Sequence, residues 1–242
     1  MTKKPFLGFS DTTLNHFMLH KVGLPTFYGQ AFLPDVCELA PEMLPYTKRY
    51  FEEFLKTGTI REVRPSELWY TSRTDFSPEA LGTELPAHKN TGFELLQGPA
   101  QFEGEILGGC IDSMYEMFSG WRYGDMPEVC RNYGLFPSMD DWRGKILLME
   151  SCEEYMPPET YKKALETLQE TGVFDAVSGV LVGKPMDDMY HAEYKKLLVS
   201  IIANKELPIL CNINVGHAQP RCILPFGVPA HVDADAQVIR FG

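Results

Sequence analysis

The 242-residue sequence predicts an α/β fold, because short apolar segments of strand length alternate with stretches of helical periodicity. The predicted strands of the second half are residues 102–107, 145–150, 179–183, 208–212, 230–232 and 237–241. Apolar residues recur at helical spacing over 157–172 and 191–205, and each of these segments lies between two strands. With 44% hydrophobic and 23% charged residues, the chain is expected to form one large globular domain or two small ones.

The N-terminal part begins with an apolar run over residues 5–9, which predicts a strand that turns at Ser10 into a helix. Apolar residues at helical spacing follow this turn: Leu14, Phe17, Met18 and Val22. A second helix is predicted over 42–55, before Gly58. Residues 58–98 are rich in Ser, Thr, Pro and Gly, so we interpret them as a linker with loops, although their aromatic residues suit a small local core equally well.

Charge and cysteine usage exclude several function classes. The formal net charge of −11 repels a phosphate backbone, so no nucleic-acid partner is predicted, while a nucleotide-sized ligand stays open. The six cysteines form no CxxC pair and have no histidine neighbours at metal-ligand spacing, which favours a reducing compartment. Without a bilayer-spanning apolar stretch or the apolar region of a signal peptide, the chain is predicted to be cytoplasmic, with no membrane partner.

Ser10 is the candidate nucleophile. A serine at a strand-to-helix turn exposes its hydroxyl, and the N–H groups at the helix start can stabilise a developing oxyanion. The lipase pattern G-x-S-x-G is not matched, because Thr12 stands at the place of the second glycine. A helix-capping role of Ser10 or Asp11 explains the same residues without any catalysis.

Glu150 and His217 are candidates for the acid and the base. Glu150 ends the apolar run KILLME, and active sites of α/β folds gather where such strands end. His217 follows the strand PILCN, after a glycine that lets the backbone approach a partner. An exposed strand-end carboxylate and an unpartnered loop histidine are the alternatives. The order Ser, acid, His matches α/β-hydrolase triads, in which His217 takes the proton of Ser10 and Glu150 orients His217.

Other groupings in the sequence carry weaker signals. Cys110 follows a strand and could be a thiol nucleophile, but no base is evident beside it, so a buried core cysteine is the better interpretation. The pairs Asp140/Asp141 and Asp187/Asp188 could be metal ligands. Because no histidine cluster accompanies them, we interpret them as solvated loop carboxylates and predict no metal site.

Motifs along the whole chain carry a family resemblance: KPFLGFSDTTLNHF, GLPTFYGQ, EGEILGGCIDSM, WRGKILLMES, GVLVGKP and LPILCNINVGHAQPRCILPFGV. In this order they resemble the peptidase S66 family, which holds bacterial LD-carboxypeptidases and microcin C immunity peptidases. The resemblance implies that residues 1–57 are the remnant of an N-terminal flavodoxin/Rossmann-like domain with the strand, serine turn and helix. It also implies a linker and aromatic loop over 58–98, and a C-terminal swivelling β/β/α-type domain over 99–242.

The resemblance also implies an activity. The family's catalytic serine, glutamate and histidine map to Ser10, Glu150 and His217, which would hydrolyse an amide through an acyl-enzyme without metal or cofactor. The backbone N–H of Asp11 would be one oxyanion donor. The implied partner is a small substrate, either a cell-wall tetrapeptide or an aminoacyl nucleotide, and a homodimer is expected by analogy. The stretch PSELWYTSRTDF looks like the aromatic loop of the immunity branch, where Trp69 would stack on a substrate base.

Two departures from the family pattern shape the expectations. The family's Gly-Gly-Asn segment, which lies near the substrate, is Gly108, Gly109 and Cys110 here, so a thiol replaces a polar side chain. Family members also carry a long Rossmann-like segment before the serine turn, and here the sequence begins nine residues before Ser10. Without the second oxyanion donor of that segment, which is typically worth about 2.7–4 kcal/mol, we expect poor activity or poor stability of this chain alone. The alternative function is a catalytically silent remnant that acts as a binding module.

Overall fold

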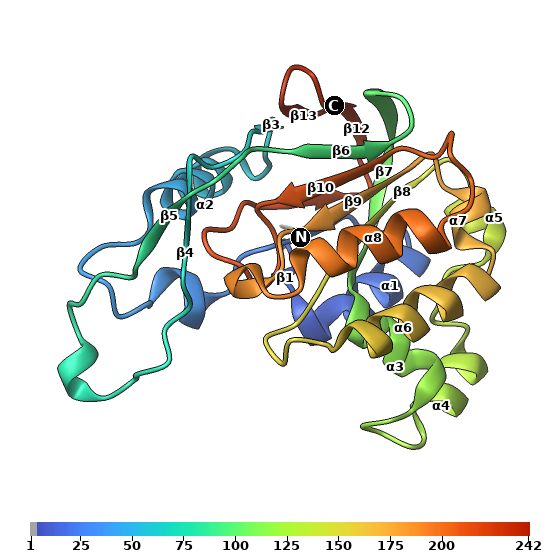
Figure 1. Cartoon of the computed structure of the whole chain (residues 1–242), viewed down its shortest axis with the longest axis horizontal. Helices are drawn as coiled ribbons and strands as arrows, with labels where there is room; N and C mark the ends of the chain where they lie inside the picture. Colours follow the sequence, from blue (N-terminus) through green and yellow to red (C-terminus); the bar gives the residue numbers. More distant parts are fainter. Residues whose placement is uncertain (1–3) are drawn as a thin grey trace.

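The computed structural model describes residues 4–242. In this part of the chain the strands form an eight-stranded sheet, a three-stranded sheet and a two-stranded arm, with helices packed around them (Figure 1). Within the same range, none of the helices has the length and apolar character needed to cross a membrane.

Parallel strands form the centre of the eight-stranded sheet: β7 (Gln101–Cys110), β8 (Ile146–Glu150), β9 (Gly179–Gly183) and β10 (Ile209–Ile213). They lie side by side in chain order. Every residue of β8, β9 and β10 is buried, which is why these strands read as continuous apolar runs. The predicted strands of the second half therefore mark the centre of the molecule.

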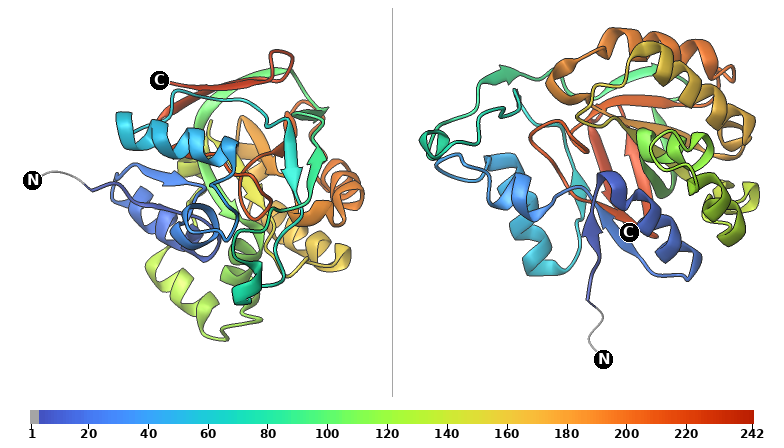
Figure 2. Two further views of the ribbon diagram at one scale, coloured as in Figure 1. Left: turned by 90° about the vertical axis from the view of Figure 1, so that its left-hand side faces the viewer. Right: turned by 90° about the horizontal axis from the view of Figure 1, so that it is seen from below.

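Helices connect the parallel strands and lie on one face of the sheet (Figures 1 and 2). The main ones are α3 (Ile111–Ser119), α6 (Pro158–Glu170) and α8 (His191–Ile201), and α6 packs against the other two. Shorter helices complete the connections: α4 (Met126–Tyr133), α5 (Met139–Trp142) and α7 (Val173–Ala176). The periodicity predicted α6 and α8, both of which are amphipathic helices that bury one face.

Antiparallel strands extend both edges of the large sheet. On the β7 side they are β12 (Pro229–Asp233), β13 (Val238–Phe241) and β3 (Glu62–Val63), and on the β10 side β6 (Glu94–Gln97). Thus the segment interpreted as linker and loops, 58–98, supplies the strands at both edges of the sheet. Strands of two and four residues are too short to show an alternating pattern, so the sequence could not reveal them.

The three-stranded sheet holds the serine turn. It is built from β1 (Leu7–Gly8), β2 (Thr26–Tyr28) and β11 (Leu224–Phe226), with β1 parallel to β2 and β11 antiparallel to it. The strand predicted before Ser10 is thus present, and it lies at the edge of this sheet. Helix α1 (Thr13–Lys21) follows it and packs on β7.

The remaining elements surround the small sheet. Helix α2 (Pro45–Thr57) ends at Gly58, as the sequence predicts, and the φ of +72° at this glycine closes the helix in the left-handed conformation. The arm consists of β4 (Leu68–Tyr70) and β5 (Ala87–Lys89), which extend to the left in Figure 1. Short 3-10 or π turns complete the description: η1 (Ser10–Thr12), η2 (Phe32–Val36), η3 (Pro78–Ala80) and η4 (Met186–Asp188).

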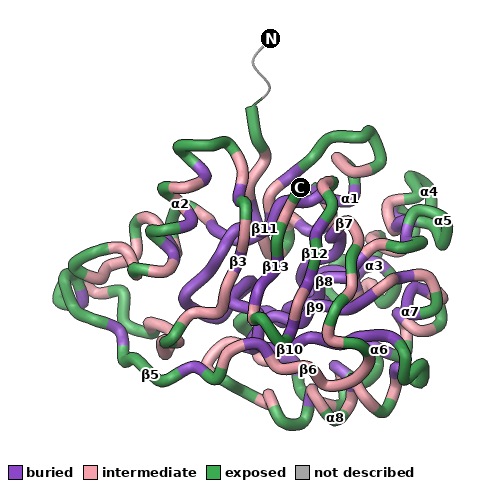
Figure 3. The backbone as a smooth tube through the Cα atoms, turned by 90° about the horizontal axis from the view of Figure 1, so that it is seen from above, coloured by how far each residue is buried: buried purple, intermediate pink, exposed green. Residues whose placement is uncertain are grey.

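The hydrophobic core lies between the large sheet and the helices. Figure 3 shows the buried backbone gathered in the central strands, whereas the outer loops are exposed. Trp142 and Phe17 meet edge to face in the core, and Tyr161 stacks on Tyr194 at 3.9 Å between α6 and α8. Each large apolar side chain buried in this way contributes about 1.5–3 kcal/mol, so the core holds the strand ends of the large sheet in fixed positions.

Candidate active site

One loop joins the two sheets and brings polar side chains to the carboxyl edge of the large sheet. Glu150 is the last residue of β8. After β10 the chain runs through residues 214–223, which carry His217, and then enters the small sheet as β11. Because β1 of the same small sheet leads into Ser10, this loop places the base between the acid on one sheet and the serine on the other.

Ser10 occupies a strained turn. Its φ is +63°, in the left-handed region that residues other than glycine seldom adopt. The turn is held by two hydrogen bonds, because the Ser10 N–H donates to Tyr28 Oη at 3.0 Å and the Ser10 carbonyl accepts from Thr13 Oγ1 at 2.7 Å. Strain of this kind persists only where the surroundings enforce it, and it is frequent at active sites.

The serine, histidine and glutamate side chains lie within hydrogen-bond reach in that order. His217 Nε2 is 3.1 Å from Ser10 Oγ, and His217 Nδ1 is 2.7 Å from Glu150 Oε2. The His217 backbone N–H also donates to Glu150 Oε2 at 3.3 Å. A carboxylate on Nδ1 leaves Nε2 directed toward the hydroxyl, which is the orientation that proton transfer from a serine requires.

Tyr28 closes this chain of hydrogen bonds into a ring. Its hydroxyl donates to Glu150 Oε1 at 2.6 Å and accepts from the N–H of Ser10. Both oxygens of the buried Glu150 therefore have donors, Tyr28 on one and His217 on the other. The ring fixes the position of the serine backbone relative to the acid as well as that of the serine hydroxyl relative to the base.

Arg221 holds the histidine loop from behind. Its guanidinium donates to the carbonyls of Gly216 and His217, the latter at 2.7 Å, and pairs with Asp35 Oδ1 at 2.9 Å. The same guanidinium lies over the ring of Phe9, the residue before the serine, at 4.9 Å. Both partners of this ion pair are buried, so Arg221 ties the histidine loop to Asp35 of η2 on one side and to Phe9 of the serine turn on the other.

The electrostatic surroundings favour a charged imidazole. Burial by itself lowers the pKa of His217, but the charge and hydrogen bond of Glu150 and the contact with Glu153 outweigh it and raise the pKa to about 9. Arg221 opposes this rise by charge repulsion. Such surroundings would stabilise the imidazolium that forms when a histidine accepts a proton from serine.

Gly216 allows the close approach of loop and acid. A Cβ at this position would lie 2.3 Å from Glu150 Oε2, and the φ of +87° suits glycine alone. The sequence prediction that Gly216 lets the histidine approach a partner therefore has a physical basis: the carboxylate occupies the space of the missing side chain.

The other residues predicted near the substrate take different places. Asp11 follows the serine in the η1 turn, and its carboxylate lies 3.5 Å from Ser113 Oγ. Gly108 and Gly109 are buried in β7, where a Cβ would collide with the backbone of β8 or with Thr13 and Tyr28. These glycines thus meet a packing requirement, and their contact with substrate stays a prediction.

Cys110 lies beneath the site. Its side chain is only 1% exposed, and its Sγ is 3.6 Å from Asp112 Oδ2. Burial, together with the nearby carboxylates of Glu150 and Asp112, raises the pKa of the thiol well above its usual range. A protonated, buried thiol is a poor nucleophile, which agrees with the interpretation of Cys110 as a core cysteine.

Trp69 lies on the arm beside the histidine loop. Its ring stacks on His88 of the neighbouring strand at 4.2 Å, and Lys184 Nζ lies 4.8 Å from its ring centre. The next residue, Tyr70, donates its N–H to the carbonyl of Gln219 at 3.0 Å, two residues beyond His217. The arm therefore approaches the candidate site, while the predicted stacking of Trp69 on a base stays a prediction.

The paired aspartates have partners within the protein. Asp141 accepts a hydrogen bond from the N–H of Ser138, the N-cap of α5, in a capping box, and Asp140 pairs with Arg143 at 3.2 Å. Asp187 accepts a hydrogen bond from the Ser72 N–H at 2.7 Å. In the range that the structure describes, no group of three or more histidine, cysteine or acidic side chains is placed to hold a metal ion.

Sequence reasoning missed three residues of the site: Tyr28, Glu153 and Arg221. Nothing in the sequence marks Tyr28 or Arg221 as polar partners, because their contacts cross between strands and loops far apart in the chain. For Glu153 the one available signal is its position three residues after the strand-end acid Glu150.

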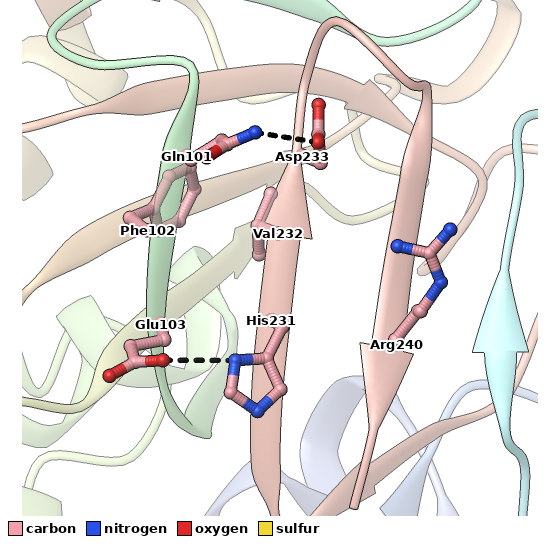
Figure 4. Close-up of a pocket in the computed structure, with 7 residues that line it drawn as sticks. All are labelled: Gln101, Phe102, Glu103, His231, Val232, Asp233 and Arg240. Atoms are coloured by element: carbon pink, nitrogen blue, oxygen red, sulfur yellow. Dashed lines mark hydrogen bonds and ion pairs between the residues drawn. The ribbon is translucent and has the colours of Figure 1, made fainter.

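A separate hollow lies on the outer strands of the large sheet (Figure 4). It is lined by a row of side chains across β7, β12 and β13, in which His231 pairs with Glu103 at 2.9 Å and Arg240 stands opposite His231. The candidate site contributes none of the lining side chains. The His231–Glu103 contact is exposed and of the kind that contributes about 0–1 kcal/mol, and we assign no function to the hollow.

The fold and the site are those of a hydrolase-like α/β protein. An acid ends a strand of the parallel sheet, a histidine lies on the adjoining loop, and a serine occupies a strand-to-helix turn. The family model described as the LD-carboxypeptidase C-terminal domain matches residues 103–232. The chain belongs to the peptidase S66 family, which confirms the resemblance stated from the motifs. The predicted α/β fold, with the serine turn followed by the family's C-terminal domain, is likewise confirmed.

Known relatives are longer than this chain. It is 26% identical over 241 residues to the microcin C7 self-immunity protein MccF of Escherichia coli, covering 96% of this chain and 63% of MccF. A crystal structure of an MccF-like protein from Streptococcus pneumoniae in complex with AMP is 59% identical, with a TM-score of 0.98 over all of this chain and 70% of that one. MccF in complex with glutamyl sulfamoyl guanosine shares the fold at a TM-score of 0.76. The chain spans 60–66% of the length of the curated relatives it matches.

Proposed function

We propose that this chain carries the catalytic centre of a serine-type carboxypeptidase or amidase of the MccF-like branch. The observation that supports the proposal best is the alignment of Ser10 Oγ, His217 Nε2 and Glu150 at 3.1 and 2.7 Å. The strained serine turn and the glycine that accommodates the acid support the same function. The proposed mechanism uses protein groups alone.

In the proposed reaction, His217 removes the proton of Ser10 as the hydroxyl attacks the acyl carbon of the substrate. The N–H of Asp11, at the start of the η1 turn, donates to the oxyanion of the tetrahedral intermediate. His217 then protonates the leaving group, which leaves an acyl-enzyme on Ser10. Water, activated by the same histidine, hydrolyses this ester, while Glu150 stabilises the imidazolium in both steps.

The proposed substrate class is an aminoacyl nucleotide. Support comes from the MccF-like protein bound to AMP, which is 59% identical to this chain, and from the placement of Trp69 near the histidine loop. By analogy with the family we also propose a homodimer in the cytoplasm.

The function is tested with aspartyl sulfamoyl adenosine as substrate. Product release is followed by mass spectrometry, and the acyl-enzyme is sought as an increase in the intact mass of the protein. We expect Ser10→Ala to lose at least about a thousandfold in rate, because the nucleophile is removed. Ser200→Ala, an equal change on the exposed side of α8, should keep the parent rate. If Ser10→Ala hydrolyses the substrate as fast as the parent, the proposed mechanism is wrong; a parent without turnover would favour the silent binding module.

A further inference from the structure

A second carboxylate contacts the catalytic face of His217. Glu153 lies in the turn that follows β8, three residues after Glu150, and its Oε2 is 3.0 Å from His217 Nε2. The same nitrogen faces Ser10 Oγ at 3.1 Å. One imidazole is thus held by Glu150 on Nδ1 and by Glu153 on Nε2, and the nitrogen that should accept the serine proton already has an anionic partner.

This contact has a consequence for proton transfer. The ion pair with His217 lowers the pKa of Glu153 to about 2, and Arg122 adds to this effect, so Glu153 is a carboxylate at neutral pH. Together with Glu150 and against the repulsion of Arg221, Glu153 keeps His217 protonated. A protonated imidazole has no lone pair to accept the proton of Ser10, so Glu153 must leave Nε2 before the attack.

The side chain of Glu153 is exposed to solvent and lies close to the reacting atoms. Its side chain is 61% exposed, whereas that of Glu150 is fully buried. Because Ser10 Oγ and Glu153 Oε2 both contact the same nitrogen, they lie within about 6 Å of each other. An α-amino group of a substrate is two bonds away from the carbon that Ser10 attacks. A small movement of Glu153 therefore brings its carboxylate to that group.

The side chains around Glu153 carry an excess of negative charge, which favours the binding of a cation. Arg122, whose charge acts on Glu153, is itself bound by Glu154 at 2.5 Å. The carboxylate of Asp11 also acts on Arg122. The surroundings of Glu153 therefore contain more acidic than basic side chains. A substrate ammonium could replace His217 as the partner of Glu153 without leaving a carboxylate unpaired.

Building on the proposed function, we propose that Glu153 binds the free α-ammonium of an aminoacyl substrate and thereby releases His217 Nε2 to act as the base. When Glu153 turns to the ammonium, the proton on Nε2 passes to solvent and the neutral imidazole faces Ser10. A substrate whose α-nitrogen is already in an amide carries no charge there and leaves Glu153 on the histidine. The chain thus selects aminoacyl nucleotides, which have a free α-amine, over peptides in which the α-nitrogen of the same residue is part of a peptide bond.

Binding of a matched ligand pair tests the proposal without any turnover. Alanyl sulfamoyl adenosine and propionyl sulfamoyl adenosine differ only in the α-amine, and their Kd values are measured by calorimetry at pH 7 in a Ser10→Ala background. We expect the amine-bearing ligand to bind at least about tenfold more tightly, as for one charge-assisted hydrogen bond. Glu153→Gln should reduce this preference to less than about twofold. Glu154→Gln removes a neighbouring exposed carboxylate and should keep it.

Titration of His217 by NMR provides a second measurement. With Ser10 intact and no ligand, Glu153→Gln should lower the pKa of His217 toward 6.5. In the Ser10→Ala variant, which cannot turn the ligand over, alanyl sulfamoyl adenosine should have the same effect, since it also removes Glu153 from Nε2. Equal binding of the two ligands, a preference that survives in Glu153→Gln, or no binding of either ligand would overturn the proposal. Failure of the proposed function would instead be seen as unchanged hydrolysis in Ser10→Ala, whatever the ligand preference.

Discussion

Glu150 is a buried carboxylate whose charge is compensated by hydrogen bonds from several directions. Tyr28 donates to one oxygen, and the side chain and backbone of His217 donate to the other. A buried charge of this kind is tolerated only when its hydrogen bonds are satisfied, so each donor should matter for both stability and proton transfer.

Tyr28→Phe tests this at the scale of a single atom. The variant leaves Glu150 Oε1 and the Ser10 N–H without their partner, and an unsatisfied buried group costs about 1–3 kcal/mol. We expect the free energy of unfolding in urea to fall by that amount and kcat to fall at least about tenfold, with KM little changed. Tyr46→Phe is the control, since it removes an equally local hydrogen bond, to the Arg64 carbonyl at 2.7 Å, outside the site. If both variants lower kcat equally, the role of Tyr28 is only structural.

At the scale of elements, the sequence reveals what is long and periodic. The buried strands β8, β9 and β10 were predictable because a strand covered on both faces is apolar along its whole length. Helices α6 and α8 were predictable from their apolar spacing. Strands β2, β6 and β11 were not, because three or four residues show no period and their pairing depends on partners distant in the chain.

The same limit applies to the site. Ser10 and Glu150 stand at ends of elements and His217 lies in the loop after a strand, where chemistry is expected, and their order along the chain suggests a triad. Tyr28 and Arg221 act through contacts between elements, which no local pattern encodes. The distances that join any of these residues come only from the way the histidine loop connects the two sheets.

Gly216→Ala tests the fit between that loop and β8. The added methyl group would lie 2.3 Å from Glu150 Oε2, at a backbone φ of +87°. We expect displacement of Glu150 or His217, a loss of at least about a hundredfold in kcat, and a lower free energy of unfolding. Gly227→Ala is the matched control, because its φ is +78° but the nearest atom, Pro25 Cα, is 3.5 Å away. A Gly216→Ala variant with parental kcat would show that the close approach is dispensable.

At the scale of the molecule, two buried histidines with opposite pKa shifts connect folding to pH. His16, on α1, faces β1 and β2, with Nδ1 2.7 Å from Thr26 Oγ1. Its burial lowers its pKa from 6.5 to about 4, although the hydrogen bond to the Gly8 carbonyl opposes this. His217, between the two sheets, has its pKa raised to about 9. The neutral form of His16 and the charged form of His217 therefore favour the folded state.

The signs of these shifts predict a stability maximum near pH 6.5. Below it, the unfolded chain protonates His16 more readily than the folded protein does, so stability falls as the pH drops toward 4. Above it, the folded protein keeps a proton on His217 that the unfolded chain has lost, so the stabilisation disappears as the pH rises through about 9. Each change is at most roughly 3–3.5 kcal/mol. Urea unfolding from pH 4 to 8.5 follows both changes below the range in which the buried cysteine thiols, whose pKa is raised by burial, add a further loss. His16→Gln and His217→Gln should reduce the slope on the acidic and alkaline sides, respectively. If His217→Gln leaves the alkaline side unchanged, the imidazole is not held in its charged form, and the pairing of Glu150 and Glu153 with it must be weaker than the distances indicate.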